Sequence, residues 1–333
     1  MASVREVPIS PGMTDTDTLN AALAPIAATR ATGRIEGTRA SIILDVTALD
    51  DASRDDLEAK VRAAAMALPG IDAVRVAQTS ERVTRRLIAV ASGKGGVGKS
   101  TLSANLAVAL VRKGVKVGLV DADIYGPSQP KLLDAEGVKP TAKDKQLIPI
   151  ATKYGLPMLS MGQMVAADQA IAWRGPMAAG ALGQLVDADW GTVDTLVVDL
   201  PPGTGDVQLT MIQKYRPAGA VIVSTPQDLA LIDAKRAIDL FNKAGIPIIG
   251  LVENMSGYAC PSCGEISNPF GKGGAEAAAS VLGIPFLGRV PLDMAIRMAS
   301  DAGVPPASGN APESVAFTQI AGLVQDWLNR EGV

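Results

Sequence analysis

Histidine is absent from this sequence of 333 residues. Without an imidazole, Ser-His-Asp hydrolysis, Cys-His proteolysis, His-ligated zinc catalysis and His-based pH sensing cannot operate in their usual form. Every catalytic acid, base or metal ligand must therefore be Asp, Glu, Lys, Tyr, Cys or a backbone group.

Strong positive charge and long hydrophobic runs are also missing. The chain has 31 Lys and Arg against 34 Asp and Glu, a net charge of −3, so no global positive field attracts nucleic acid or an anionic membrane. The N-terminus lacks a basic region followed by an apolar run, and no 18 consecutive apolar residues occur. We therefore expect no signal peptide, membrane span or nucleic-acid partner, and a cytoplasmic protein.

Only two cysteines are present, and both lie in the segment Cys260-Pro261-Ser262-Cys263, which excludes a long-range disulfide within the chain. Their spacing lets both sulfurs face one metal, but two ligands are too few to close a site. A symmetric dimer would bring four cysteines together, around either a tetrahedral metal ion or a [4Fe–4S] cluster. Structural zinc and a redox-active pair remain alternatives.

The pattern of the chain predicts two α/β domains. Residues 1–80 are expected to form a small one, with a strand at 40–46, a helix from Ser53 and a strand at 71–76. Residues 81–86 are polar and without periodicity, as in a linker. From 87 to 333, short apolar strands alternate with helical stretches, which predicts a mostly parallel, doubly wound sheet. The expected strands are 87–91, 115–120, 195–199, 220–224, 246–252 and 284–287.

A glycine-rich loop follows the first of these strands and precedes a helix. Its sequence satisfies G-x-x-x-x-G-K-[ST], a pattern whose backbone N–H groups bind the phosphates of a nucleoside triphosphate. Lys99 would reach the β- and γ-phosphates, and the Ser100 hydroxyl would bind Mg²⁺. The predicted nucleotide-binding residues of this loop are Gly93, Lys94, Gly95, Gly96, Val97, Gly98, Lys99, Ser100 and Thr101.

An additional lysine in this loop, Lys94, carries a family resemblance. The sequence GKGGVGKST resembles the deviant Walker A loop of the MinD, ParA and nitrogenase iron-protein class of dimeric ATPases. The resemblance implies that Lys94 crosses a dimer interface and contacts the nucleotide of the partner subunit.

Carboxylates end two of the expected strands, where ligands gather in a doubly wound sheet. Asp199 would hold Mg²⁺ through a water, and Asp121 or Asp123 would orient the attacking water; the resemblance favours Asp123. The segment 201–206, PPGTGD, resembles the loop that senses the γ-phosphate. The resemblance further implies that Asn254 recognises the adenine edge, so the expected nucleotide is ATP.

Five motifs together, GKGGVGKST, DADIYGPSQP, VVDLPPGTGD, VENMS and CPSCG, resemble the Mrp/ApbC family of iron–sulfur cluster carrier ATPases in order and spacing. The resemblance covers about residues 87–330. It implies a slow homodimeric ATPase that holds a [4Fe–4S] cluster through Cys260 and Cys263 and transfers it to apoproteins, with cluster-assembly scaffold proteins as further partners. Residues 1–80 resemble a domain often fused before these ATPases, but they lack its Asp-Pro-Glu and cysteine motifs, so we expect no metal there.

Two other functions remain possible. One is a MinD/ParA-like spatial organiser that binds a membrane or DNA; the other is a zinc-stabilised regulatory ATPase. The final helix has few basic residues beside its apolar stripe, which is typical of a core helix and not of a membrane anchor. That stripe is expected to comprise Val315, Ile320, Leu323, Val324, Trp327 and Leu328.

Overall fold

The computed structural model describes residues 15–47, 49, 51–79, 85–124, 126–143, 146–164 and 175–330. The chain divides into two compact units, residues 1–84 and 85–333. The predicted linker at 81–86 lies outside the described residues except for its last two positions, and Arg86 already belongs to strand β4.

The N-terminal unit is a three-stranded sheet covered by two helices. Strands β1 and β2 are antiparallel, and β2 and β3 are parallel, with α2 as the crossover connection. Along β2, Ala40, Ile42 and Leu44 are buried while the residues between them are exposed, so the sheet has one core face. The elements are α1 (Thr16–Ala27), β1 (Ala31–Glu36), β2 (Arg39–Asp45), α2 (Asp51–Met66) and β3 (Ala73–Thr79). The last strand begins two residues later than predicted.

An eight-stranded sheet forms the centre of the larger unit, in the order β15-β12-β11-β4-β10-β5-β9-β8. Neighbouring strands are parallel except for β8 and β9, which are antiparallel. The strands are β4 (Arg86–Ala91), β5 (Val117–Asp121), β8 (Ile150–Ala151), β9 (Pro157–Ser160), β10 (Thr195–Asp199), β11 (Gly219–Ser224), β12 (Ile248–Asn254) and β15 (Phe286–Val290). The predicted mostly parallel sheet is confirmed; the sequence reasoning missed β8 and β9, which are short.

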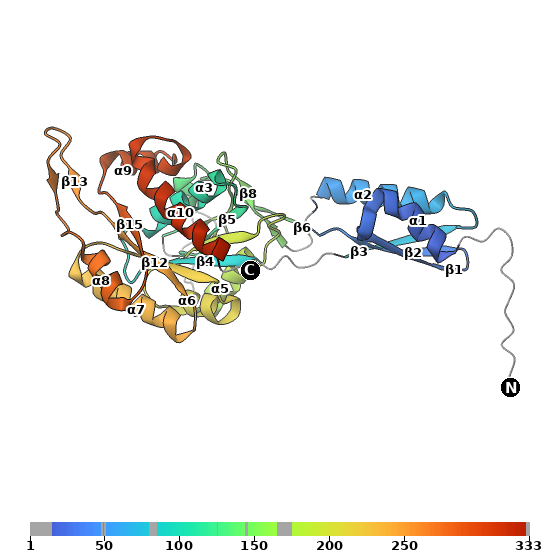
Figure 1. Ribbon diagram of the computed structural model, residues 1–333, viewed down its shortest axis with the longest axis horizontal. Helices are drawn as coiled ribbons and strands as arrows, with labels where there is room; N and C mark the ends of the chain where they lie inside the picture. The colour runs from blue at the N-terminus through green and yellow to red at the C-terminus, as the bar shows by residue number, and fades with distance from the viewer. Residues whose placement is uncertain are drawn as a thin grey trace. The chain divides into compact units, whose positions relative to one another are not determined.

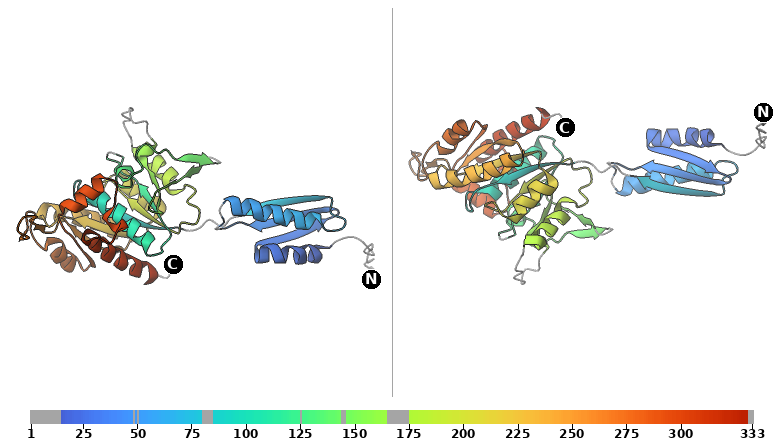
Figure 2. Two further views of the ribbon diagram at one scale, coloured as in Figure 1. Left: turned by 90° about the horizontal axis from the view of Figure 1, so that it is seen from above. Right: turned by 90° about the horizontal axis from the view of Figure 1, so that it is seen from below.

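Helices cover both faces of this sheet (Figure 1). One hydrophobic core lies under α3 (Lys99–Arg112), α9 (Met294–Asp301) and α10 (Val315–Arg330). The other lies under α5 (Gly175–Val186), α6 (Asp206–Thr210), α7 (Asp228–Lys243) and α8 (Gly274–Leu282). Figure 2 shows the same layers from above and below. Apart from short 3₁₀- and π-helical turns, the remaining described elements are α4 (Gln129–Leu132) and two hairpins, β6 (Thr141–Lys143) with β7 (Gln146–Ile148) and β13 (Tyr258–Ala259) with β14 (Ile266–Ser267).

Helix α10 belongs to the core, as predicted, because Phe317, Ile320 and Leu328 are fully or almost fully buried. Two positions of the predicted apolar stripe were wrong: Val315 is 49% exposed and Leu323 is 44% exposed. Both lie outside the arc that faces the sheet. Among the described residues, the structure contains no helix that is both long and apolar enough to cross a membrane.

The strand order brings the predicted chemistry to one edge of the sheet. Strand β10 lies between β4 and β5, so Asp199 pairs in register with Val90 on one side and with Asp121 on the other. The glycine-rich loop follows strand β4. From this loop the chain continues through α3 to β5, which lies on one side of β4, whereas the later strand β11 lies on the other side of β4. This reversal opens a crevice at the carboxyl ends of the strands, where ligands bind in such sheets.

Candidate functional site

The glycine-rich loop connects β4 to α3 and ends at Gly98, the N-cap residue of α3, which has φ +80°. Two close approaches make glycine necessary. A Cβ on Gly93 would overlap the backbone of Asp233 in α7, and a Cβ on Gly98 would overlap the Asn254 side chain. The loop therefore fits tightly between two neighbouring elements, while its inner side remains open.

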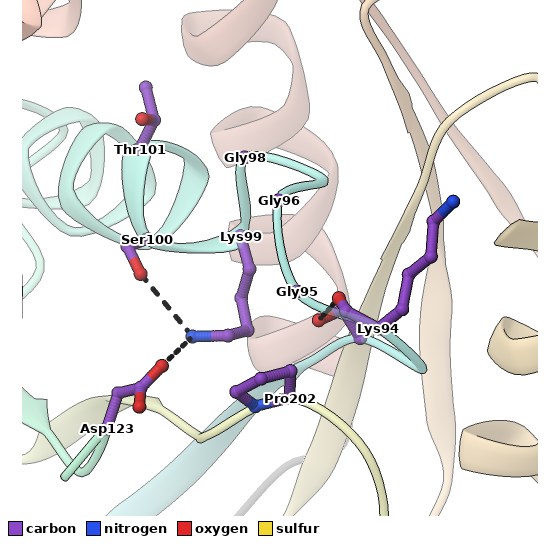
Figure 3. Close-up of a pocket in the computed structure, with 10 residues that line it drawn as sticks. Lys94, Gly95, Gly96, Gly98, Lys99, Ser100, Thr101, Asp123 and Pro202 are labelled. Atoms are coloured by element: carbon purple, nitrogen blue, oxygen red, sulfur yellow. Dashed lines mark hydrogen bonds and ion pairs between the residues drawn. The ribbon is translucent and has the colours of Figure 1, made fainter. Parts of the chain in front are cut away.

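That inner side lines a cavity of about 210 Å³ (Figure 3). All the predicted loop residues line it except Gly93 and Val97, and Val97 is buried beneath the loop. Asp123 lines the cavity from the end of β5, and Pro202 lines it from the segment after β10. Backbone N–H groups at a helix N-terminus, the Lys99 ammonium group and the hydroxyls of Ser100 and Thr101 suit a polyphosphate.

Lys99 extends from the loop toward Asp123 (Figure 3). Its side chain is 5% exposed, and its Nζ lies 2.6 Å from Asp199 Oδ1 and 3.8 Å from Asp123 Oδ2. Its Nζ also lies 3.4 Å from Ser100 Oγ. The lysine thus connects the hydroxyl predicted to bind Mg²⁺ with both predicted carboxylates, and it is the counter-ion of Asp199.

Asp199 is fully buried and receives further hydrogen bonds from two residues that the sequence reasoning missed. Ser103 Oγ, one helical turn after Lys99, donates to Asp199 Oδ1 at 2.9 Å. Gln129 Nε2 donates to Asp199 Oδ2 at 2.8 Å and to the Ser100 carbonyl at 3.0 Å. Gln129 lies in the quoted motif DADIYGPSQP, so the sequence contained a signal for it, whereas Ser103 had none beyond its helical spacing.

Asp121 and Asp123, the two candidates for orienting water, lie in different surroundings. Asp123 lines the cavity, whereas Asp121 is fully buried and accepts hydrogen bonds from Ser160 Oγ at 2.9 Å and Gln129 N at 3.1 Å. Burial, and secondly the neighbouring Asp199 carboxylate, raise the pKa of Asp121 to about 7. Of the two, only Asp123 borders the space that a nucleotide would occupy.

Lys94 points away from Lys99 in Figure 3. Its Nζ lies 3.4 Å from the amide oxygen of Gln227, at the N-cap of α7. Ser92 Oγ donates to the Lys94 carbonyl at 2.9 Å and so holds the backbone at this position. Lys94 is partly exposed, and among the described residues its Nζ forms no ion pair with the acidic residues around Lys99.

Asn254, the last residue of β12, contacts the loop from the side. Its Nδ2 donates to the Val97 carbonyl at 2.8 Å, and the same amide fills the space beside Gly98. Asn254 does not line the phosphate cavity. Its role in adenine recognition remains a prediction, and the sequence did not indicate its contact with the loop.

The two cysteines lie in the turn of the β13–β14 hairpin. Cys260 N donates to the Glu265 carbonyl at 2.9 Å, and Gly264 N donates to the Cys260 carbonyl at 2.8 Å. Cys263 is exposed and Cys260 is partly exposed; both are free thiols. Backbone N–H groups of Cys263 and then Ser262 donate to the Cys260 sulfur and lower the pKa of its thiol.

Such hydrogen bonds favour the thiolate, the form of cysteine that binds metals. Among the residues that the structure describes, no three His, Cys, Asp or Glu side chains are grouped to hold a metal ion. One copy of the described chain therefore offers two thiol ligands at the surface without completing a metal site.

Comparison with known proteins identifies the family. Residues 83–326 match the family described as NUBPL iron-transfer P-loop NTPase, within the ParA group. The chain belongs to this family. It is a P-loop ATPase, as the resemblance implied, and its relatives include proteins named iron–sulfur cluster carrier protein. One from Pseudomonas fragi is 48% identical over 242 residues, which are 71% of this chain and 84% of that protein.

Another carrier protein of the family, from Deinococcus radiodurans, is 43% identical over 302 residues, which are 87% of this chain and 85% of that protein. Among solved structures, an Archaeoglobus fulgidus nucleotide-binding protein in complex with ADP has a TM-score of 0.60 and 39% identity, covering 69% of this chain and 90% of its own. MinD of Pyrococcus furiosus has a TM-score of 0.55 and 26% identity, covering 73% and 99%. The fold is therefore that of the MinD and ParA ATPases.

Proposed function

We propose that this NUBPL-family ATPase is a cytoplasmic homodimer that carries a [4Fe–4S] cluster between the cysteines of its two subunits and transfers the cluster to apoproteins. The cysteine hairpin is the observation that carries this proposal. It exposes two free thiols at metal-binding spacing, and backbone N–H groups favour the thiolate of one of them. Two copies supply four thiolates, the ligand set of a [4Fe–4S] cluster.

ATP would bind with its phosphates in the loop cavity. Lys99 would break its ion pair with Asp199 and bind the β- and γ-phosphates instead, because its flexible side chain already borders the cavity. Asp123 would orient the attacking water, since it is the carboxylate of its pair that faces the cavity. Lys94, which points away from its own subunit's Lys99, would reach the nucleotide of the partner subunit. Asn254 would contact the adenine.

The donor set of this cavity fits Mg²⁺, which prefers oxygen ligands. The Ser100 hydroxyl lines the cavity, and Asp199 lies behind it with an oxygen that is released when Lys99 turns to the phosphates. We propose that Ser100 binds the ion directly and Asp199 binds it through water. When bound, Mg²⁺ would neutralise charge on the phosphate oxygens.

Anaerobic reconstitution with iron and sulfide tests the cluster assignment. The wild-type protein should take up about four iron atoms per dimer, measured by iron assay together with molar mass in solution. Cys260→Ser and Cys263→Ser should lose this uptake, while Ser267→Ala, in the same hairpin, should keep it. Equal iron in all four proteins would refute the assignment, and zinc in the protein as isolated would favour a zinc-stabilised ATPase instead.

A further inference from the structure

The segment from Glu253 to Gly257 joins the end of β12 to the cysteine hairpin. It lies between two places that the proposed function treats separately, the phosphate loop and the thiols. Asn254 is the last residue of β12, and Cys260 follows six residues later. The contacts of this short segment connect both places through Asn254, the proposed adenine contact, and through Glu253 and Ser256, which neither ATP hydrolysis nor cluster binding uses.

Within this segment, Asn254 is in direct contact with the phosphate loop. Its Nδ2 donates to the Val97 carbonyl at 2.8 Å, and it leaves no room for even a Cβ on Gly98. Gly98 is the residue at which the loop becomes helix α3. A displacement of the loop toward β12 therefore has to move Asn254 as well.

Glu253, the residue before Asn254, holds the base of the hairpin through Ser256. This carboxylate is fully buried, and its Oε1 accepts hydrogen bonds from Ser256 Oγ at 2.8 Å and Arg289 Nε at 3.1 Å. Its Oε2 accepts from Ala275 N at 2.9 Å, in the first turn of α8. A buried carboxylate with these partners joins the hairpin, strand β15 and α8 at one point.

After Asn254, at Met255, the backbone adopts a conformation that residues with a Cβ rarely take. Met255 has φ +58°, and Gly257 has φ +73°. The hydrogen bonds of Asn254 and Ser256 on either side hold Met255 there, and Ser256 N also donates to the Val290 carbonyl at 3.0 Å. Backbone conformations of this kind persist where the surroundings over-determine them, and they often mark segments that change state.

We propose that residues 253–256 couple nucleotide occupancy of the phosphate loop to the position of the cysteine hairpin, with Glu253 and Ser256 as positioning residues. The inference rests on the proposed function, because it assigns to the same nucleotide and thiol sites the residues that connect them. Nucleotide binding moves the loop against Asn254, and this displacement changes the backbone at Met255. The hydrogen bond between Ser256 and Glu253 then converts the displacement into a change in the position of Cys260.

The alkylation rate of Cys260 measures this coupling. In a Cys263→Ser background without iron, a Mg²⁺ complex of a non-hydrolysable ATP analogue should change the rate of modification by iodoacetamide by about fivefold, within the usual range of coupling between two sites. Ser256→Ala should bring this ratio to about one, and Ser256→Thr, which keeps a hydroxyl, should restore it. Ser280→Ala, on the exposed side of α8, is the matched control and should leave the ratio unchanged.

Calorimetric titration with the analogue and thermal unfolding accompany each variant. The affinity for the analogue should be the same for Ser256→Ala and Ser256→Thr. Ser256→Ala should melt at a lower temperature, because the buried Glu253 carboxylate loses one donor. Both variants should be folded at the temperature of the alkylation assay, so that a difference in coupling is not a difference in folding. The coupling is overturned if the bound analogue leaves the alkylation rate of Cys260 unchanged in the wild-type sequence at position 256. It is also overturned if the analogue still changes that rate in Ser256→Ala. Failure of the wild-type protein to bind the analogue, or failure of iron uptake with the coupling intact, instead counts against the proposed function.

Discussion

Lys99→Met should destabilise the empty protein, in addition to abolishing ATP turnover. Methionine keeps most of the apolar stem of the lysine but removes its charge. In the structure that charge lies 2.6 Å from the fully buried Asp199 and 3.8 Å from Asp123. The substitution therefore leaves a buried carboxylate with only neutral donors, Ser103 and Gln129.

The expected cost follows from the burial of both partners. Removing one member of a buried ion pair typically costs about 3–5 kcal/mol, because the other charge stays desolvated without compensation. For a domain of roughly 250 residues, each kcal/mol lowers the melting temperature by about 2–4 °C. Lys99→Met should therefore lower it by about 6–20 °C at pH 8. The loss should be smaller at pH 5, because Asp121, with its pKa raised to about 7, is then protonated and the acidic cluster carries less charge.

Thermal unfolding of the nucleotide-free protein at both pH values measures this effect, with Lys94→Met as the matched control. Lys94 lies in the same loop, but its ammonium group contacts the neutral amide oxygen of Gln227. Its substitution should change the melting temperature by less than about 2 °C, the shift expected for a surface position. Both variants should lose ATP hydrolysis. Equal melting temperatures for Lys99→Met and the wild-type protein would show that the pair with Asp199 does not stabilise the fold.

Three further outcomes are expected. The folded protein keeps a proton on Asp121 that the unfolded chain releases near pH 3.8, so its stability should fall as the pH rises from 5 to 8, and Asp121→Asn should flatten this profile in urea unfolding. Gly98→Ala should cost about 2 kcal/mol or more through overlap with Asn254 and positive φ, and less in an Asn254→Ala background, as a double-mutant cycle would measure. Cys260, in a Cys263→Ser protein, should be alkylated at lower pH than an ordinary thiol, because its pKa is lowered.

Each of these three predictions can be refuted by one result. Parallel pH profiles for Asp121→Asn and the wild-type protein would remove Asp121 as the titrating group. Strictly additive costs for the two substitutions would mean that Gly98 and Asn254 do not interact. Alkylation of Cys260 with the pH dependence of a free thiol in water would mean that the backbone N–H groups do not stabilise its thiolate.

Local patterns in the sequence were sufficient to predict the centre of the fold. The central strands are short runs rich in Val, Ile and Leu, as expected of strands buried on both faces, and segments long enough to form a helix connect them. The phosphate loop was also evident, because its glycines, lysine and hydroxyl are consecutive. By contrast, strands β8 and β9, with two and four residues, are too short to show a period, so the edge of the sheet was not predicted.

The sequence by itself determined which reactive and ligand-binding groups are present: a phosphate loop, carboxylates at strand ends and two cysteines, with no histidine. Tertiary structure alone decided which groups meet. It pairs Lys99 with Asp199, 100 positions away, buries Asp121 while Asp123 borders the cavity, and puts Asn254 against Gly98. These relations depend on strand order, because parallel strands that are distant in the chain end side by side, and no local pattern encodes which strands become neighbours.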